Sequence, residues 1–371
     1  MSPCDSQPGS AFQALDRIRL VTHEDRDFHH SNRGSGLEIL EKSLEGLKMR
    51  NLAVLTSGGD APGMNAAIRA VVRTGIAHGI TVWGVYQGFA GLIEGDFKRL
   101  GARDVGSIIQ RGGTILGSAR CTKFQTSEGR ELAIHRMRGA GIEGLIVIGG
   151  NGSQTGSYTL HQMGFPVVGV ASTIDNDLFG SDVAIGVDTA LNVALSAIDN
   201  LKVTASSLQR TFFVEVMGRK CGYLALMSGV AGGAEAVVLP EVEVVPEQLA
   251  DRICDAYERG KPHVIVVVAE GAKYNADGLC RYFSEHNLLP EYEFRSTVLG
   301  YVQRGAVPTC ADRLLGTRLG AEAVERLSAG QLGVLVGTHN CEVVTTSLEA
   351  VVHGHKALDP WFSRMADMLA R

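Results

Sequence analysis

Short, continuously apolar runs rich in β-branched residues recur along the chain and constrain its fold more than any other feature. Strands buried on both faces have this pattern, because neither face can carry polar side chains. The runs are Leu52–Leu55, Ile80–Val85, Gly144–Ile148, Val167–Val170, Thr211–Val216, Ala236–Leu239 and His263–Val268. Amphipathic helical patterns lie between them, for example over Met64–His78. This alternation predicts an α/β fold with parallel-rich sheets and right-handed crossovers.

Composition and charge narrow the class of protein. A length of 371 residues predicts two domains, or one large α/β domain with an appendage. The residues are 45% hydrophobic and 6% aromatic and include 46 glycines, which suits an enzyme with many short loops. A net charge of −5 with no basic block indicates no nucleic-acid partner. No apolar run reaches the ~20 residues of a membrane span and no signal-peptide pattern is present, so we expect a soluble, cytoplasmic protein without a membrane partner. The seven scattered cysteines are expected to be reduced thiols.

Two glycine-rich turns follow apolar runs, where ligands collect in parallel sheets. Thr56–Asn65 contains Gly58 and Gly59, which let the backbone approach a ligand, and its amides at a helix start can face an anion. Gly149–Ser153 is a second such turn, with the amides of a polyphosphate nest and the hydroxyl of Ser153. Either turn alone could be a tight connection, but the pair favours a phosphate or nucleotide ligand.

Two further loops carry charged groups at strand ends. Thr173–Asp177 places two carboxylates, Asp175 and Asp177, two residues apart, an arrangement suited to a base beside a cation. A capped turn is the alternative for such residues. In Met217–Gly222, Arg219 could clamp a phosphoryl group, since a guanidinium binds two of its oxygens at once.

At these residues the sequence closely resembles the 6-phosphofructokinase family of the phosphofructokinase A type, and most of all its bacterial ATP-dependent members. The resemblance runs from about Leu52 to Leu358, and the combination of Thr173–Asp177 with Met217–Arg219 is highly specific. It implies glycolytic phosphoryl transfer from ATP to the C1 hydroxyl of fructose 6-phosphate. It also implies the phosphofructokinase fold, two Rossmann-like three-layer αβα domains with parallel-rich sheets.

The resemblance implies domain boundaries as well. Residues 49–186 plus 303–348 would form the larger, nucleotide-binding domain, and 187–302 plus 349–371 the smaller, sugar-phosphate-binding domain. Residues 1–48 are polar and are predicted to be a flexible extension; a metal site at His29 and His30 is less favoured, since no partner ligands have suitable spacing.

By similarity, four residues would be catalytic: Asp175 as general base, Thr173 beside it, and Arg219 with the Gly59 amide stabilising the transferring group. The ATP-binding positions would be Gly59, Arg120, Cys121, Gly150, Asn151, Gly152 and Ser153. The sugar-phosphate positions would be Thr173, Asp175, Arg210, Met217, Gly218, Arg219, Glu270, Arg295, Tyr301 and Arg304. Mg²⁺ would be the cofactor, held by Asn151 and Asp177.

The family also implies quaternary structure and regulation. Its members are homo-oligomers, usually tetramers, in which the counterparts of Arg210 and Arg295 reach a neighbouring subunit's site. An allosteric site for a nucleoside diphosphate or phosphoenolpyruvate is matched by Arg69, Arg73, Lys202, Glu235, Arg259 and Lys261. Ala102 replaces an arginine usual in that site.

Two departures affect the active site itself. Asn151 stands where ATP-dependent members usually have a metal-binding Asp in a Gly-Gly-Asp-Gly-Ser loop, so metal affinity should fall. Tyr301 replaces a histidine that binds the sugar phosphate. Pyrophosphate-using relatives carry Asp and Lys at the positions of Gly152 and Ser172, so these two residues favour ATP.

Two alternatives to an ATP-dependent enzyme remain open. One is pyrophosphate-dependent transfer to the same sugar phosphate. The other, prompted by Asn151, is a regulatory subunit that binds nucleotide and sugar phosphate with weakened catalysis. A kinase acting on NAD or a lipid is less favoured, because the Thr173–Asp177 and Met217–Gly222 loops would then have no role.

Overall fold

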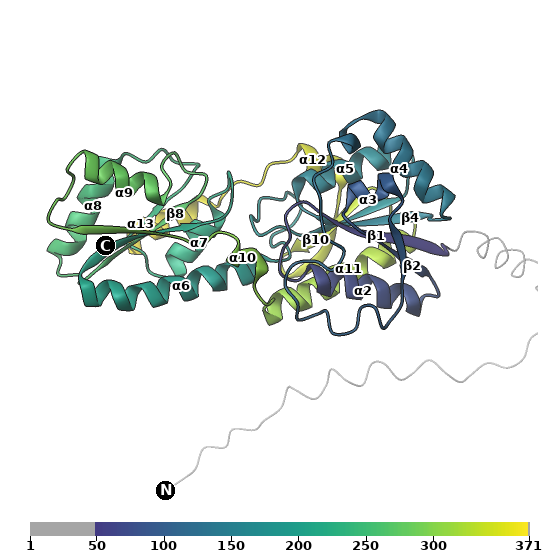
Figure 1. The fold of residues 1–371 in the computed structure, drawn as a ribbon, viewed down its shortest axis with the longest axis horizontal. Coiled ribbons are helices and arrows are strands. Elements are labelled where there is room, and N and C mark those ends of the chain that lie inside the picture. Colours follow the sequence, from purple (N-terminus) through teal and green to yellow (C-terminus); the bar gives the residue numbers. More distant parts are fainter. Residues whose placement is uncertain (1–48, 370–371) are drawn as a thin grey trace, which may run out of the picture. The chain divides into compact units, whose positions relative to one another are not determined.

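The computed structural model describes residues 49–369, which contain two β-sheets flanked by helices (Figure 1). The predicted flexible extension 1–48 lies outside the described residues. No helix within the described range is long and apolar enough to cross a membrane.

The first sheet has seven strands in the order β11-β10-β5-β4-β1-β2-β3. Its five inner strands are parallel, and the two edge strands β3 and β11 are antiparallel. The strands are β1 (Asn51–Ser57), β2 (Thr81–Val85), β3 (Phe97–Leu100), β4 (Gly144–Gly149), β5 (Val167–Ala171), β10 (Val334–His339) and β11 (Glu342–Ser347).

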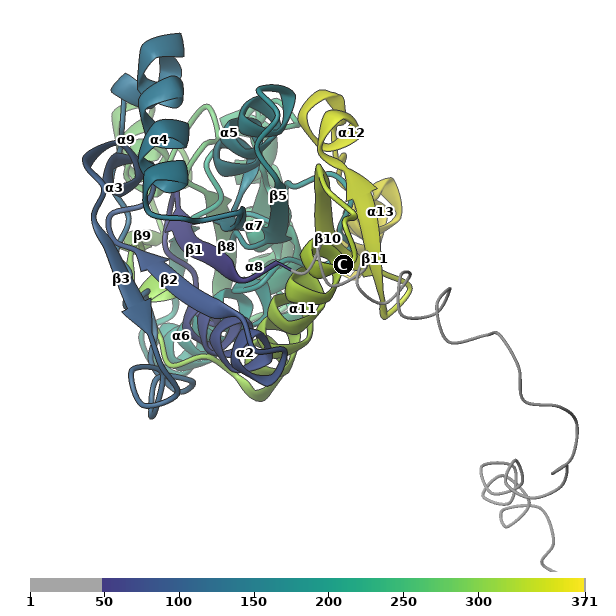
Figure 2. The same cartoon turned by 90° about the vertical axis from the view of Figure 1, so that its right-hand side faces the viewer.

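Helices cover both faces of this sheet, which explains its apolar strands (Figure 2). Leu52 and Val54 face one core and Ala53 and Leu55 the other, as the period of two along a strand requires. The first core lies under α2 (Met64–Ala77) and α11 (Cys310–Ser328). The helices of the opposite face are α3 (Phe89–Glu94), α4 (Ser127–Gly139), α5 (Asn151–Gln162) and α12 (Leu348–His353), with the 3₁₀ turn Lys123–Gln125 beside them.

The second sheet has four parallel strands in the order β7-β8-β6-β9. They are β6 (Arg210–Val216), β7 (Ala236–Val238), β8 (Val264–Ala269) and β9 (Glu293–Val298). Its two faces are covered by α6 (Val187–Leu208) and α7 (Tyr223–Ala231), and by α8 (Pro246–Glu258) and α9 (Ala276–Glu285). The remaining helices are α10 (Val302–Gly305) and α13 (Pro360–Leu369), and α13 packs against α7.

The α/β class and parallel-rich sheets are confirmed, and each apolar run is a strand of the structure. Strands β3, β9 and β11 were not anticipated, because their polar residues, such as Lys98 and Arg295, remain exposed at sheet edges. The inner strand β10 was also missed, although its residues from Leu335 to Thr338 are buried. The division of residues 49–369 into two domains near 186 and 302 stays a prediction, although each sheet draws on one of the two predicted sets of segments.

A buried carboxylate fixes the start of α6. Asp312, which is 1% exposed on α11, accepts hydrogen bonds from the amides of Gly186 (2.7 Å) and Thr189 (2.8 Å) and from the Thr189 hydroxyl (2.6 Å). Because Gly186 is the N-cap of α6, this carboxylate satisfies amides that the helix leaves unpaired. Asp312 therefore joins the first sheet's α11 to the helix that covers the second sheet.

We expect Asp312→Ala to lower the free energy of unfolding by about 2–4 kcal/mol, because buried amides lose their acceptor. Urea titration of both proteins measures the difference. Asp104→Ala is the matched control, since Asp104 accepts the Gly101 amide at 2.8 Å in an exposed turn; its loss should stay under about 1 kcal/mol. Equal losses for the two variants would contradict this role for Asp312.

Candidate active site

A cavity of about 700 Å³ lies where the carboxyl ends of β1, β4 and β5 meet the loop after β6 and the turn α10. Residues from four predicted loops line it together, as expected for strands that end at a common edge. Its predicted site residues are Gly59, Arg120, Cys121, Gly150, Asn151, Gly152, Ser153, Thr173, Asp175, Asp177, Arg219 and Arg304.

The glycine turns give this cavity an open backbone surface. A Cβ on Gly59 would come within 2.7 Å of a guanidinium nitrogen of Arg304, so only glycine admits that side chain against the β1 turn. On the other side Gly150 caps α5 without a side chain, which leaves the first amides of this helix for a ligand. A Cβ on Gly152 would meet nothing within 4 Å, so the space above this turn is open.

Asp175 lies at the inner wall of the cavity and is only 6% exposed. Its Oδ2 is 3.9 Å from Nε of Arg219, and Oδ1 has no hydrogen-bond partner among the described residues. Burial raises the pKa of this carboxyl from 3.8 to about 6, and the nearby Asp177 adds to the rise while Arg219 and Arg304 oppose it. The group is thus poised to accept a proton near neutral pH.

The loop around Asp175 is held from both sides. Asn176 adopts the left-handed conformation (φ 52°), with its side chain donating to the carbonyl of Asp182 and accepting from the Ala184 amide, both at 3.1 Å. Lys356 donates to the carbonyls of Ser181 (2.7 Å) and Asp182 (2.8 Å), and burial lowers the pKa of this lysine to about 8. These contacts keep Asp175 facing the cavity.

Arg219 is presented by an unusual turn after β6. Both Gly218 (φ 144°) and Arg219 (φ 53°) have positive φ, and their amides donate to Oε1 of Glu270 at 3.2 and 2.8 Å. The backbone of Arg219 is therefore fixed, while 63% of its side chain remains exposed. Glu270 acts on this loop rather than lining the cavity.

Unsatisfied polar atoms concentrate at this site. Ser153 Oγ, Asp175 Oδ1 and Arg304 Nε are buried and lack hydrogen-bond partners within residues 49–369. Buried polar atoms are normally paired, and an exception calls for an absent partner such as a ligand or water. One hydroxyl, one carboxylate and one guanidinium around a common cavity fit a phosphorylated ligand.

The donor set also fits Mg²⁺. Asp177 and Asn151 both line the cavity, and the Asn151 amide lies 3.5 Å from the Asp177 carbonyl. Mg²⁺ is usually held by one or two carboxylates together with substrate phosphates. No cluster of three or more acidic, His or Cys residues able to hold a metal occurs in the described part of the chain, so substrate oxygens would have to complete the coordination.

Two predicted sugar-phosphate residues lie elsewhere on this subunit. Arg210 begins β6, and Arg295 is on the neighbouring β9; both pair with Glu293. Because β6 leads from Arg210 toward the cavity, its length separates Arg210 from that end of the sheet by about 20 Å. The cavity of this chain thus lacks both arginines.

The remaining sugar-phosphate residues lie next to the cavity without being among its lining residues. Met217 and Gly218 are buried in the turn that presents Arg219. Tyr301 is 77% exposed, and its ring lies 5.7 Å from the Arg304 guanidinium carbon. This phenol is therefore open to solvent beside the arginine that lines the cavity.

The six predicted effector residues fall into two groups. Arg69 and Arg73 lie on α2, while the other four lie around the second sheet. Lys261 pairs with Glu235 at 2.8 Å, Glu235 accepts the Ile265 amide at 2.7 Å, and Lys202 donates to the Gly232 carbonyl.

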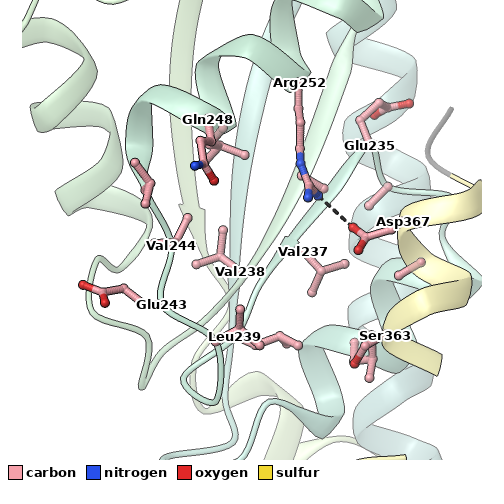
Figure 3. A pocket seen from close by; sticks show the side chains of 17 residues that line it. Glu235, Val237, Val238, Leu239, Glu243, Val244, Gln248, Arg252, Ser363 and Asp367 are labelled. Atoms are coloured by element: carbon pink, nitrogen blue, oxygen red, sulfur yellow. Dashed lines mark hydrogen bonds and ion pairs between the residues drawn. The ribbon is translucent and has the colours of Figure 1, made fainter. Parts of the chain in front are cut away.

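A second cavity, of about 200 Å³, adjoins Glu235. Figure 3 shows Arg252 of α8 reaching Asp367 of α13, and the two form an ion pair at 2.8 Å. Val237 and Leu239 contribute apolar surface between α8 and α13. The C-terminal helix thus borders the predicted effector cluster.

The sequence did not single out several residues that line the main cavity, among them Asp60, Phe89, Ser118, Thr122 and Gln125. Phe89 stacks on Phe124 at 4.1 Å between ring centroids and offers an apolar wall. Nothing in local sequence marks Phe89, since it begins a short helix after β2. Asp60 could have been found, because it extends the first glycine turn.

The phosphofructokinase family model matches residues 51–327. The chain belongs to the phosphofructokinase family. The ATP-dependent 6-phosphofructokinase of Halalkalibacterium halodurans is 50% identical over 322 residues, covering 87% of this chain and 100% of the relative. ATP-dependent 6-phosphofructokinase 1 of Thermus thermophilus is 51% identical over 324 residues, with the same coverage.

Solved structures place this member of the family in the same fold. Pichia pastoris phosphofructokinase in the T-state superimposes with a TM-score of 0.77 at 35% identity. The match covers 82% of this chain and 35% of the Pichia chain. The predicted phosphofructokinase fold is thereby confirmed.

The burial of Asp175 predicts a stability cost. The rise of its pKa from 3.8 to about 6 corresponds to roughly 3 kcal/mol. Because the carboxyl keeps its ordinary pKa in the unfolded state, the unfolded state loses this proton first. The free energy of unfolding therefore falls as the pH rises from about 4 through about 6. We expect Asp175→Asn to be about 1–3 kcal/mol more stable than the parent at pH 8 and to lose that advantage near pH 4.

Urea unfolding at both pH values measures the difference. Asp96→Asn, at an exposed aspartate, is the control and should change little at either pH. If Asp175→Asn is less stable than the parent at pH 8, the buried Asp175 carboxylate does not lower the free energy of unfolding, and the prediction is wrong.

Proposed function

We propose that the chain transfers the γ-phosphoryl group of ATP to the C1 hydroxyl of fructose 6-phosphate, giving fructose 1,6-bisphosphate and ADP. The observation that carries this proposal is the buried Asp175 carboxylate, which faces two glycine turns across one cavity and whose Oδ1 has no hydrogen-bond partner within residues 49–369. Family membership and the names of relatives about 50% identical support both the reaction and the donor.

Asp175 acts as the general base. Its Oδ1 takes the proton of the C1 hydroxyl while the alkoxide oxygen forms a bond to the γ-phosphorus and the bond to the ADP oxygen breaks. With a pKa of about 6, the carboxylate is ionised at neutral pH yet basic enough to accept a proton in the transition state. Thr173 supports the loop, because its hydroxyl oxygen accepts a hydrogen bond from the Asp175 backbone amide at 3.2 Å.

Arg219 and the Gly59 amide stabilise the transferring group, while Arg304 is one of the cations that bind the sugar phosphate. Arg219 lies beside Asp175, and Arg304 lies against Gly59, so cationic groups approach from two sides. Charge on the phosphoryl oxygens is best met by donors already in place, because no reorganisation is then needed during the reaction. The start of α5 and Arg120 bind the other phosphates of the nucleotide.

The open space at Gly152 favours ATP over pyrophosphate. A Cβ there would meet nothing within 4 Å, whereas an Asp, as in the pyrophosphate-using relatives, would enter the region beside the α5 amides. Ser172 is fully buried and neutral, so it adds no charge. Room for an α-phosphate and a nucleoside therefore remains.

Mg²⁺ would be held by Asp177 and the Asn151 carbonyl and would neutralise charge on the phosphates. Asp177 contributes the carboxylate, and Asn151 contributes a neutral ligand where a second charge is usual in the family. Metal binding would therefore depend strongly on the bound nucleotide.

We also propose a homo-oligomer, a tetramer by family resemblance, in which Arg210 and Arg295 complete a neighbour's sugar-phosphate site. Their distance from this chain's own cavity supports the idea. The Lys202, Glu235, Arg259 and Lys261 group would bind an anionic effector together with Arg69 and Arg73. A cytoplasmic location and the two domain boundaries stay predictions.

The decisive experiment compares phosphoryl donors. Purified protein with Mg²⁺ and saturating fructose 6-phosphate should form fructose 1,6-bisphosphate with ATP and at most traces with pyrophosphate. Asp175→Asn should lower kcat by about 10²–10⁴-fold, the usual contribution of a general base. Faster turnover with pyrophosphate, or an Asp175→Asn variant as active as the parent, would refute the assignment.

Asn151→Asp tests the metal site. Adding a carboxylate near the cation should lower the Mg²⁺ concentration for half-maximal activity by about tenfold, since a pair of charges near a protein surface interacts by roughly 1–4 kcal/mol. Asn151→Ala is the control and should raise that concentration. A regulatory subunit without catalysis would bind both ligands but remain inactive even with Asp at this position.

A further inference from the structure

Gln303 is fully buried between three elements that carry the active site, and its side chain forms hydrogen bonds with backbone atoms of two residues that do not line the cavity. Its Oε1 accepts the Met217 amide at 2.8 Å, and its Nε2 donates to the Ala190 carbonyl at 3.3 Å. A backbone donor on one side and a backbone acceptor on the other fix which end of the carboxamide is oxygen.

Each partner of Gln303 lies close to a catalytic group. Met217 is two residues before Arg219, at the start of the positive-φ turn after β6. Ala190 is in the first turn of α6, which follows the loop that holds Asp175 and Asp177. Gln303 itself directly precedes Arg304, whose guanidinium lies against Gly59.

The element that carries Gln303 cannot hold its own position. α10 is a single turn of four residues, and both its N-cap Tyr301 and its first residue Val302 are exposed. Such a short helix has little stability of its own. Its placement must come from tertiary contacts, and the buried carboxamide supplies two of them.

We propose that Gln303 is a positioning residue that fixes Arg304, which would bind the sugar phosphate, relative to Arg219, which would bind the transferring phosphoryl group. The inference rests on the proposed function, because it assigns Gln303 a role in that reaction. The carboxamide locks α10 to the Arg219 turn through Met217 and to α6 through Ala190. Neither hydrogen bond involves the start of α5, where phosphates of the nucleotide would be held, so we expect the effect to fall on the sugar side and on turnover.

Three substitutions separate the contacts. Gln303→Met keeps the volume and removes both hydrogen bonds. Gln303→Asn keeps the amide but is one methylene too short to reach both partners. Gln303→Glu keeps the length and an acceptor for the Met217 amide.

Steady-state kinetics give the main readout. We expect Gln303→Met and Gln303→Asn to lower kcat by about 10–100-fold and to raise the KM for fructose 6-phosphate, because a misplacement of about 1 Å in an active site can cost this much. Gln303→Glu should retain a larger share of kcat than either. The dissociation constant of a non-hydrolysable ATP analogue, measured by calorimetry, should stay within about twofold of the parent for all three.

Ser228→Ala is the matched control for the loss of a buried hydrogen bond. Ser228 is 1% exposed on α7 and donates to the Leu224 carbonyl at 2.5 Å. The Ser228→Ala variant should keep the parental kcat, KM for fructose 6-phosphate and dissociation constant for the ATP analogue. Its thermal midpoint shows how far the loss of one buried hydrogen bond lowers stability.

Several outcomes would overturn the proposal. One is a folded Gln303→Met or Gln303→Asn protein with parental kcat and KM; another is a parallel loss of sugar and nucleotide affinity, which would mean a general structural role. If Gln303→Met does not fold, the kcat values of Gln303→Asn and Gln303→Glu decide. Equal kcat values for these two variants would contradict a role for the hydrogen bond to Met217. A parent without ATP-dependent turnover would instead defeat the proposed function, and this role with it.

Discussion

The site depends on keeping one carboxylate out of water beside cationic groups without pairing it fully. Asp175 is buried, and Arg219 approaches it at 3.9 Å rather than at hydrogen-bond distance. A closer guanidinium would lower the pKa of the carboxyl and weaken it as a base, while greater distance would leave the buried charge without support. Glu270 and Asn176 maintain this intermediate arrangement by fixing the backbones of the two loops.

Much of the fold and the main cavity could be predicted because both follow from local sequence. Apolar runs such as Val264–Ala269 mark strands covered on both faces, and the residues after parallel strands meet at one edge. Gly59, Gly150, Asp175 and Arg219 could therefore be assigned to one site without coordinates.

The rest depends on partners far apart in sequence. Gln303 contacts Met217 and Ala190, and Asp312 contacts Gly186, across separations that no local pattern encodes. The strand β9 was missed for a related reason, since it lies at a sheet edge with Arg295 exposed and so lacks a continuous apolar run.

The two faces of β1 have a consequence for how this chain can change over evolutionary time. Leu52 and Val54 belong to one core and Ala53 and Leu55 to the other, while Gly58 and Gly59 follow directly at the strand's end. Deleting one residue within β1 would exchange the residues of both cores and also draw the Gly58–Gly59 turn back from the cavity by about 3.3 Å. Insertions and deletions should therefore be tolerated in the connections on the far edge of the sheet, while packing and chemistry together should restrict changes of strand length at this edge.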